Sequence, residues 1–208
     1  MSELIAIGRD NEMETTVKSA SSEQKNALIS TIIAAFLTDP VARWICPEAH
    51  HYFSRMDEFV DAFGGAAFDH GSAYYVDGYC GAALWLPPKV QPNEEKMMTV
   101  IKDVIPEHRL EAAFSVFEKM GSFHPDEPHW YLPLVGVDPS CQARGYGSRL
   151  MTHTLERCDR EKKLAYLESS NPRNLSLYIR HGFELIGTIQ VADSPPVFPM
   201  VRKPKDVA

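Results

Sequence analysis

Apolar side chains recur at every third or fourth position early in the chain, as they do on a helix with one buried face. Between residues 28 and 37 this pattern predicts a helix over residues 21–37. Asp39 as N-cap, with Pro40 at the first helical position, predicts a second helix. A third helix is predicted over residues 48–63, where a pair of glycines ends it.

The pattern then changes to the alternation that is typical of strands. Residues 73–76 and 79–86 flank an Asp-Gly turn, which predicts a β-hairpin. Helical spacing returns in two stretches, around residues 93–103 and 107–120. The first part of the chain therefore combines helices with one hairpin.

Strands and helices alternate in the last third of the chain. In chain order we expect a strand, a helix, a strand, a short helix and two further strands, over residues 130–137, 147–162, 164–169, 174–181, 183–191 and 198–202. The first strand, helix and strand of this series imply one crossover between parallel strands. The pattern predicts a mixed α/β fold, with residues 1–208 forming a single domain.

Charge and composition narrow the class of partner. The formal net charge of −7 argues against a nucleic-acid partner and fits a cationic small substrate. No stretch approaches the about 18 apolar residues that span a bilayer, and the sequence MSELIAIGRDNEMETT lacks the pattern of a secretory signal. The four cysteines show no CxxC pair and no zinc-site spacing, so we expect scattered thiols, no metal and a cytoplasmic location.

The segment VDPSCQARGYGSRL, residues 137–150, joins a predicted strand to a predicted helix. It fails the dinucleotide pattern G-x-G-x-x-G, because Leu150 replaces the third glycine, and it lacks the Gly-Lys-Ser/Thr of a P-loop. Successive backbone N–H groups over residues 142–147, with Arg144 and the helix dipole, suit a pyrophosphate. On these residues alone, a tight strand-to-helix turn explains the glycines as well.

Two blocks, LVGVDPSCQARGYGSRLM and LESSNPRNLSLYIRHGFELIG, together resemble the GNAT superfamily of acetyl-CoA-dependent N-acetyltransferases. They match its order of strand, Q-x-x-G-x-G loop, helix, strand, Asn-containing loop, Tyr and Gly-Phe over about residues 130–190. Ala143 stands where many members have a second glycine, but only its backbone N–H would be needed. The segments FLTDPVARWICP, GAALWLPP, HWYLPLVGVDP and PPVFPMVRKP further resemble the subgroup that includes puromycin N-acetyltransferase.

The resemblance implies a GNAT-like fold, in which helices flank a mostly antiparallel sheet with one splayed pair of parallel strands. It implies an acceptor side over about residues 21–128 and an acetyl-CoA side over about residues 129–203. The implied acetyl-CoA contacts are Val135, Gly136, Val137, Gln142, Ala143, Arg144, Gly145, Tyr146, Gly147, Ser148, Asn171 and Asn174. The backbone N–H near Val135 would also polarise the thioester carbonyl, an oxyanion-type role.

The resemblance also makes Tyr178 the expected proton donor to the departing thiolate of coenzyme A. Helical spacing alone would make it a core aromatic. The inward positions of the preceding strand hold Tyr131 and Pro133, and neither is a plain base. The general base is therefore open between His129, with its suitable intrinsic pKa, and Glu168 at the end of the neighbouring strand. A surface role for His129 and a solvated one for Glu168 are the alternatives.

Trp44, Tyr74, Tyr75 and Trp85 are candidates for the acceptor pocket, because aromatic rings suit an amine through packing and cation–π contact. Residues of this kind also fill cores, and we expect that role for at least half of them. The expected activity is direct attack of a small molecule's primary amine on acetyl-CoA, by a monomer or homodimer. Two alternatives stay open: a protein or peptide N-acetyltransferase, and a non-catalytic acyl-CoA-binding module.

Overall fold

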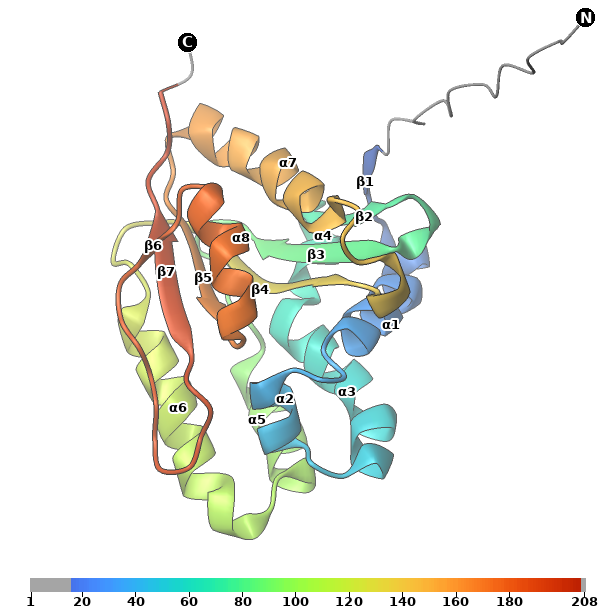
Figure 1. Ribbon diagram of the computed structural model, residues 1–208, viewed down its shortest axis with the longest axis vertical. Helices are drawn as coiled ribbons and strands as arrows, with labels where there is room; N and C mark the ends of the chain where they lie inside the picture. The colour runs from blue at the N-terminus through green and yellow to red at the C-terminus, as the bar shows by residue number, and fades with distance from the viewer. Residues whose placement is uncertain (1–15, 207–208) are drawn as a thin grey trace, which may run out of the picture.

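A computed structural model describes residues 16–206, and a seven-stranded sheet runs through them between helices (Figure 1). The spatial order of the strands is β1-β2-β3-β4-β5-β7-β6. The strands are β1 Val17–Ser19, β2 Ala73–Val76, β3 Gly81–Leu86, β4 Trp130–Val137, β5 Ala165–Ser169, β6 Glu184–Leu185 and β7 Phe198–Arg202. The α-helices are α1 Lys25–Ala35, α2 Pro40–Ile45, α3 Ala49–Gly64, α4 Ala66–Asp69, α5 Glu94–Val104, α6 Leu110–Phe123, α7 Tyr146–Glu161 and α8 Leu175–Arg180.

Strands β4 and β5 form the parallel pair of the sheet, and the other neighbouring strands are antiparallel. The parallel pair is joined only where Trp130 faces Ala165 and Tyr131 faces Tyr166. Beyond these two registers the strands separate, so residues 132–137 have no partner on the β5 side. The mixed α/β fold with a mostly antiparallel sheet and a splayed parallel pair is confirmed.

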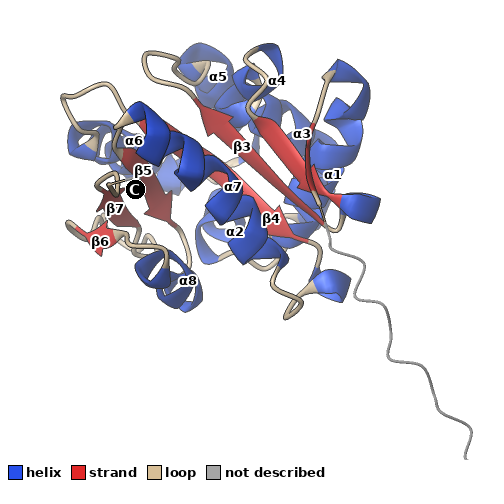
Figure 2. Ribbon diagram, turned by 90° about the horizontal axis from the view of Figure 1, so that it is seen from above, coloured by secondary structure: helices blue, strands red, loops and turns tan. Residues whose placement is uncertain are grey.

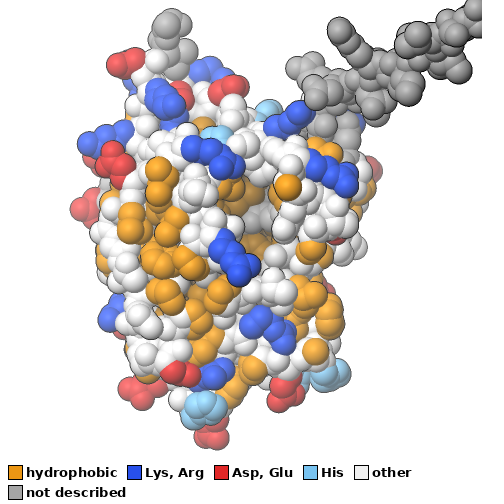
Figure 3. Space-filling view, viewed as in Figure 1, with side chains coloured by type: hydrophobic (Ala, Val, Ile, Leu, Met, Phe, Trp, Pro, Cys, Tyr) orange, Lys and Arg blue, Asp and Glu red, His pale blue; other side chains and the backbone are white. Residues whose placement is uncertain are grey.

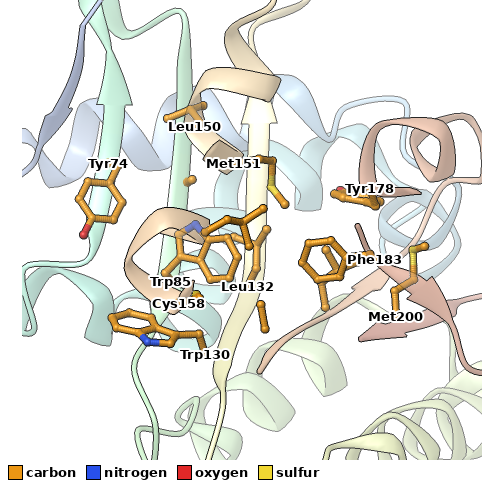
Figure 4. Close-up of a cluster of buried hydrophobic side chains, with 14 of the residues drawn as sticks. Tyr74, Trp85, Trp130, Leu132, Leu150, Met151, Cys158, Tyr178, Phe183 and Met200 are labelled. Atoms are coloured by element: carbon orange, nitrogen blue, oxygen red, sulfur yellow. The ribbon is translucent and has the colours of Figure 1, made fainter. Parts of the chain in front are cut away.

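Helices cover both faces of the sheet (Figure 2). α1, α3 and α4 pack on one face against residues such as Leu84 and Leu134, whereas α7 packs on the other. In the core beneath α7, Trp85 and Trp130 come from neighbouring strands and Tyr178 comes from α8 (Figure 4). The separation of β4 from β5 therefore leaves one edge of β4 unpaired between the two helical layers.

Strand β4 contains a bulge just before this gap. Leu84 of β3 pairs with Leu134 of β4, and Leu86 pairs with Tyr131. Between these two pairs β3 has one residue and β4 has two. The extra residue lies around Pro133, where a missing N–H is tolerated because the ladder is already interrupted. It also reverses the alternation of faces, so Tyr131 and Leu134 pack in the same cluster. The simple alternation that placed Tyr131 and Pro133 together does not continue through the bulge.

The predicted helices are confirmed to within a few residues, including α2, whose N-cap Asp39 accepts hydrogen bonds from two backbone N–H groups. The strand predicted over residues 183–191 is wrong for most of its length, because only β6 and a bridge at Ile189 pair. Beyond β6 the chain turns to pack against α6, in a small cluster of Val116, Ile189 and Val197. No helix within residues 16–206 is long and apolar enough to cross a membrane.

Two of the four cysteines lie together. Pairing of β3 with β4 brings Cys80 close to Cys141, and the two form a disulfide across 61 residues of sequence. Cys46 and Cys158 are free and buried. The expectation of scattered thiols is therefore wrong for Cys80 and Cys141, since sequence spacing does not register a contact made by strand pairing. The cysteines consequently no longer argue for a reducing compartment.

Candidate active site

Three adjoining cavities lie along the gap between β4 and β5. The first, the polar cavity, measures about 410 Å³ and is bounded by the end of β4, the loop over residues 141–148 and α8. The second, the narrow cavity, measures about 110 Å³ and lies between the two strands and α1, α2, α3 and α6. The third, the wide cavity, measures about 680 Å³ and lies between α5 and α6. Each shares lining residues with the next, so the three cavities are neighbours in the order polar, narrow, wide.

The polar cavity is closed on one side by the loop that precedes α7. Figure 3 shows the molecular surface hollowed between α8 and α1, with apolar side chains around the hollow. Ala143 and Gly145 in this loop have φ values of +62° and +79°. Such left-handed residues turn successive N–H groups to one side, and the N-terminus of the 16-residue α7 adds partial positive charge. The loop therefore suits an anionic group such as a pyrophosphate.

The unpaired edge of β4 presents further backbone donors. Asp138 donates its N–H to the carbonyl of Cys80 on the β3 side. The alternation of an antiparallel pair then turns the N–H of Gly136 toward β3 and those of Val135 and Val137 away from it. On that side β5 has separated, so these two groups face the polar cavity. Gly136 has a packing role as well, because an added Cβ would lie 2.5 Å from the Cβ of Ala35 in α1.

Tyr178 and Asp39 line both the polar and the narrow cavity. The Tyr178 ring packs edge-on against Phe183. Burial, and then the charge of Asp39, raises the pKa of Tyr178 far above its usual range, so the phenol is protonated at neutral pH. Asp39 accepts a hydrogen bond of 2.6 Å from the hydroxyl of Ser170, and burial raises its pKa.

Glu168 lies where the narrow cavity meets the wide one. Its side chain is 2% exposed, and its Oε1 lies 3.3 Å from Nε2 of His124. Within residues 16–206 this oxygen accepts no well-aligned hydrogen bond. Burial, and then the Glu168 carboxylate, raises the pKa of Tyr131 and of Tyr166 beside it. The solvated alternative for Glu168 does not hold, because its side chain is buried.

His129, the other candidate base, lines the wide cavity but not the narrow one. Its Nε2 lies 3.1 Å from Nδ1 of His124, and its Nδ1 lies 2.8 Å from the carbonyl oxygen of Glu127. His129 is therefore linked to Glu168 through His124.

The wide cavity has apolar walls and a charged rim. Its walls include Met97, Phe114 and Phe117, whereas Glu94, Glu118 and Lys102 carry its charges. A ligand with an apolar body and a cationic end fits this combination, because the apolar part can be buried while carboxylates attract the charge.

The structure brings most of the predicted acetyl-CoA contacts to one place. All of them line the polar cavity except Arg144, whose guanidinium donates to the carbonyl of Ser140. Asn171 caps the turn over residues 172–174, whereas Asn174 makes no capping bond and lines the cavity. Ser148 lies 2.8 Å from the ring of His181, which fixes the start of α7 against the end of α8.

The four candidate aromatics lie elsewhere. In the part of the chain that the structure describes, none of the four lines any of the three cavities. Tyr74 and Trp85 belong to the core beneath α7, and Trp44 packs under the guanidinium of Arg109. Tyr75 stacks on Tyr79. The aromatic walls come instead from Tyr52, Phe59, Phe63 and Phe117.

Sequence reasoning missed two residues at the cavities. Asp39 had a sufficient explanation as a helix cap, and His124 stands in a loop without a motif. His124 lies in the loop that precedes β4, and it reaches Glu168 because this loop packs against β5 in the folded protein. No group of three His, Cys, Asp or Glu side chains within residues 16–206 is arranged to hold a metal ion.

Sequence comparisons identify the family that this chain resembles. Residues 111–183 match the sequence model of the acetyltransferase (GNAT) family. A Schizosaccharomyces pombe protein described as an uncharacterized N-acetyltransferase is 25% identical over 199 residues, covering 85% of this chain and 78% of the relative.

Solved structures share the fold. A Corynebacterium glutamicum protein described as histone acetyltransferase HPA2 and related acetyltransferase is 24% identical, with a TM-score of 0.66, over 94% of this chain and 99% of that one. A Drosophila melanogaster polyamine N-acetyltransferase has a TM-score of 0.60 at 17% identity, over 91% and 100%. An Aedes aegypti arylalkylamine N-acetyltransferase has a TM-score of 0.66 at 11% identity, over 92% and 100%. At these identities the likeness is one of fold.

Proposed function

Because residues 111–183 carry the sequence pattern of the GNAT acetyltransferase family on a GNAT fold, we propose that the protein transfers an acetyl group from acetyl-CoA to a small primary amine. The observation that carries the proposal is the series of neighbouring cavities along the splayed strands. Backbone donors lie at one end of this series, and a buried carboxylate without a full set of partners lies at the other.

The residues of the polar cavity fit acetyl-CoA. The turned-out N–H groups near Ala143 and Gly145 suit its pyrophosphate, and the unpaired edge of β4 suits the amides of its pantetheine arm. Acetyl-CoA, when bound, supplies a thioester whose carbonyl carbon is open to attack. The N–H of Val135 is oriented away from β3 and would donate to the thioester oxygen.

Tyr178 and Glu168 have complementary roles in this proposal. The buried phenol of Tyr178 keeps its proton at neutral pH and can donate it to the departing sulfur. Glu168, at the far end of the narrow cavity, would take the proton that the amine must lose before or during attack. Of the two candidate bases, Glu168 is favoured, because His129 does not line the narrow cavity.

The acceptor class follows from the wide cavity. Its thioether and phenyl walls favour an amine with an apolar or aromatic body. The carboxylates at its rim attract the protonated, cationic form in which such an amine is present in solution. The fold neighbours include polyamine and arylalkylamine N-acetyltransferases, which supports a small amine. We retain the puromycin N-acetyltransferase-like subgroup as part of the proposal. A peptide acceptor is the competing outcome.

The test is a product assay with the purified chain. Acetyl-CoA would be supplied with tryptamine, 2-phenylethylamine, agmatine, puromycin and a lysine-containing peptide in separate reactions, with mass spectrometry reading the acetylated product. We expect acetylation of at least one aromatic amine. Glu168→Gln should lower its rate by about 100-fold, a general-base loss, while Glu184→Gln on the exposed β6 serves as the charge-matched control.

Each outcome decides a part of the proposal. Acetylation confined to the peptide would replace the small-molecule acceptor with a peptide. Calorimetric binding of acetyl-CoA without any acetylated product would favour the non-catalytic module. An unchanged rate in Glu168→Gln would remove Glu168 from the base role.

A further inference from the structure

Three side chains form a line from the narrow cavity to the protein surface. Oε1 of Glu168 lies 3.3 Å from Nε2 of His124, and Nδ1 of His124 lies 3.1 Å from Nε2 of His129. Nδ1 of His129 lies 2.8 Å from the carbonyl oxygen of Glu127. The side chain of Glu168 is 2% exposed and that of His124 is 21% exposed, so access to water increases from Glu168 to His124.

The carbonyl at the outer end fixes the positions of the protons. A carbonyl oxygen can only accept, so Nδ1 of His129 must carry a hydrogen. Burial lowers the pKa of His129, which keeps its ring neutral and leaves Nε2 as an acceptor. Nδ1 of His124 must then donate to that nitrogen, since two bare lone pairs would repel each other.

One nitrogen remains without a hydrogen in this arrangement. When His124 is neutral, its Nε2 carries no hydrogen and lies 3.3 Å from Oε1 of Glu168. A ring nitrogen and a carboxylate oxygen at this distance can share one proton.

We propose that Glu168 and His124 act as one proton acceptor, and that His129 is a positioning residue that fixes the tautomer of His124. The inference rests on the proposed acetyltransferase function and deepens it. The amine's N–H bond breaks and its electron pair stays on nitrogen, while the proton binds the Glu168 carboxylate. The proton then moves to Nε2 of His124, which restores the carboxylate and leaves an imidazolium to release a proton to water in the wide cavity.

Two phenol rings contact His124, and three charged side chains lie across the wide cavity. The rings of Tyr131 from β4 and Tyr166 from β5 contact it, and both phenols are neutral because burial and Glu168 raise their pKa. Across the wide cavity, α5 contributes Glu94 and Lys102, and α6 contributes Glu118. Glu168 is the charged group in direct contact with the ring among residues 16–206.

The first test reads the tautomers without any acceptor. Nitrogen-15 NMR of the free, full-length protein at neutral pH should show a hydrogen on Nδ1 of both His124 and His129. In His129→Leu, His124 should lose this fixed tautomer. A hydrogen on Nε2 of neutral His124 in the wild-type protein would overturn the inference, because that nitrogen could not then accept a proton.

The second test measures the proton-acceptor role with tryptamine, or with whichever panel amine is acetylated fastest. His124→Ala should lower kcat by at least about tenfold with KM little changed, because the interaction acts in the chemical step. Added imidazole should restore part of the rate, whereas pyrazole, of similar shape but much weaker basicity, should not. Equal recovery with both would indicate a filled cavity and overturn the role.

His129 offers a matched pair of variants. The side-chain oxygen of Gln can accept from Nδ1 of His124 but cannot titrate, so His129→Gln should retain most of the wild-type kcat. His129→Leu should lose about as much as His124→Ala. Equal losses in the two His129 variants would overturn the positioning role.

The two levels of proposal fail separately. A wild-type protein that acetylates no amine would overturn the proposed function and the catalytic part of this inference. A wild-type protein that is active, with His124→Ala equally active, would overturn the inference alone.

Discussion

Tyr178 shows that one residue can both pack in the core and line a cavity. Its ring is part of the cluster beneath α7, where it contacts Phe183, and it is 6% exposed. The residue nevertheless lines both the polar and the narrow cavity. The packed ring fixes the position of the hydroxyl, and the same burial keeps the proton on it. The two interpretations that the sequence left open for Tyr178 are therefore compatible.

Tyr178→Phe keeps the ring and removes only the proton donor. We expect a fall of about 100-fold or more in the single-turnover rate, the usual size of a general-acid contribution. Affinity for acetyl-CoA should stay nearly constant, since the interaction is made chiefly in the transition state. Stopped-flow single turnovers and calorimetry measure the two quantities. Tyr79→Phe, at an exposed tyrosine, is the control, and equal rates in both variants would reassign the role to water or backbone.

At the scale of single residues, the sequence could identify candidate site residues whose spacing along the chain follows a motif. The glycine loop, Asn171, Asn174 and Tyr178 were recognisable because a motif fixes their spacing. His124 was not, because its role depends on a contact across 44 residues of sequence with Glu168 that no local pattern encodes. The same holds for the aromatic walls of the cavities, which helices α3 and α6 supply.

Elements with a strong period were predictable, and those with an interruption were not. Helices α1, α3 and α7 repeat apolar residues over several turns, so their bounds followed closely from the sequence. The bulge near Pro133 is a feature of the pairing between β3 and β4, which no local pattern in β4 encodes. It lies where β4 stops pairing with β5, beside the cavities. Ala143 also needs the loop's conformation to be understood. Its positive φ would favour glycine at this position, since a Cβ is disfavoured in that region.

Gly147 tests the fit of the loop and α7 to the cofactor. An added Cβ would lie 3.5 Å from Leu177 and 3.8 Å from Val137, ordinary contacts that the fold tolerates. Gly147→Ala should therefore fold and weaken acetyl-CoA binding only slightly. Gly147→Val places two methyl groups at the wall of the polar cavity, and we expect at least tenfold weaker binding, about 1.4 kcal/mol.

Isothermal calorimetry with acetyl-CoA gives the affinities of this series, and circular dichroism confirms that each variant is folded. A folded Gly147→Val protein with wild-type affinity would mean that the cofactor does not approach this turn.

On the scale of the whole molecule, the last strand, β7, holds one end of the sheet together. β7 inserts between β5 and β6, so the last strand in sequence lies beside the strand that carries Glu168. Arg202 of β7 is 3% exposed and binds Asp159 of α7 through two hydrogen bonds of 2.7 and 2.8 Å, while its Nε donates to the carbonyl of His181. This ion pair joins β7 to α7 and to the end of α8, which carry two walls of the polar cavity.

Asp159→Asn should destabilise the whole fold, because it leaves the Arg202 guanidinium buried without its counter-charge. We expect a loss of about 3 kcal/mol in the free energy of unfolding at pH 7, the lower end for a broken buried pair.

Burial acts to raise the pKa of Asp159, but Arg202 and the N–H of Lys205 outweigh it, so the pKa is lowered in the folded state. A lowered pKa contributes stability above the unfolded value of about 3.9, and this contribution is lost as pH falls through the folded value. The difference between wild type and Asp159→Asn in urea unfolding should therefore be full at pH 7 and shrink below about pH 4. Glu156→Gln, an exposed carboxylate on the same helix, controls for net charge, and an equal loss in both variants would show that the ion pair does not hold β7 in the sheet.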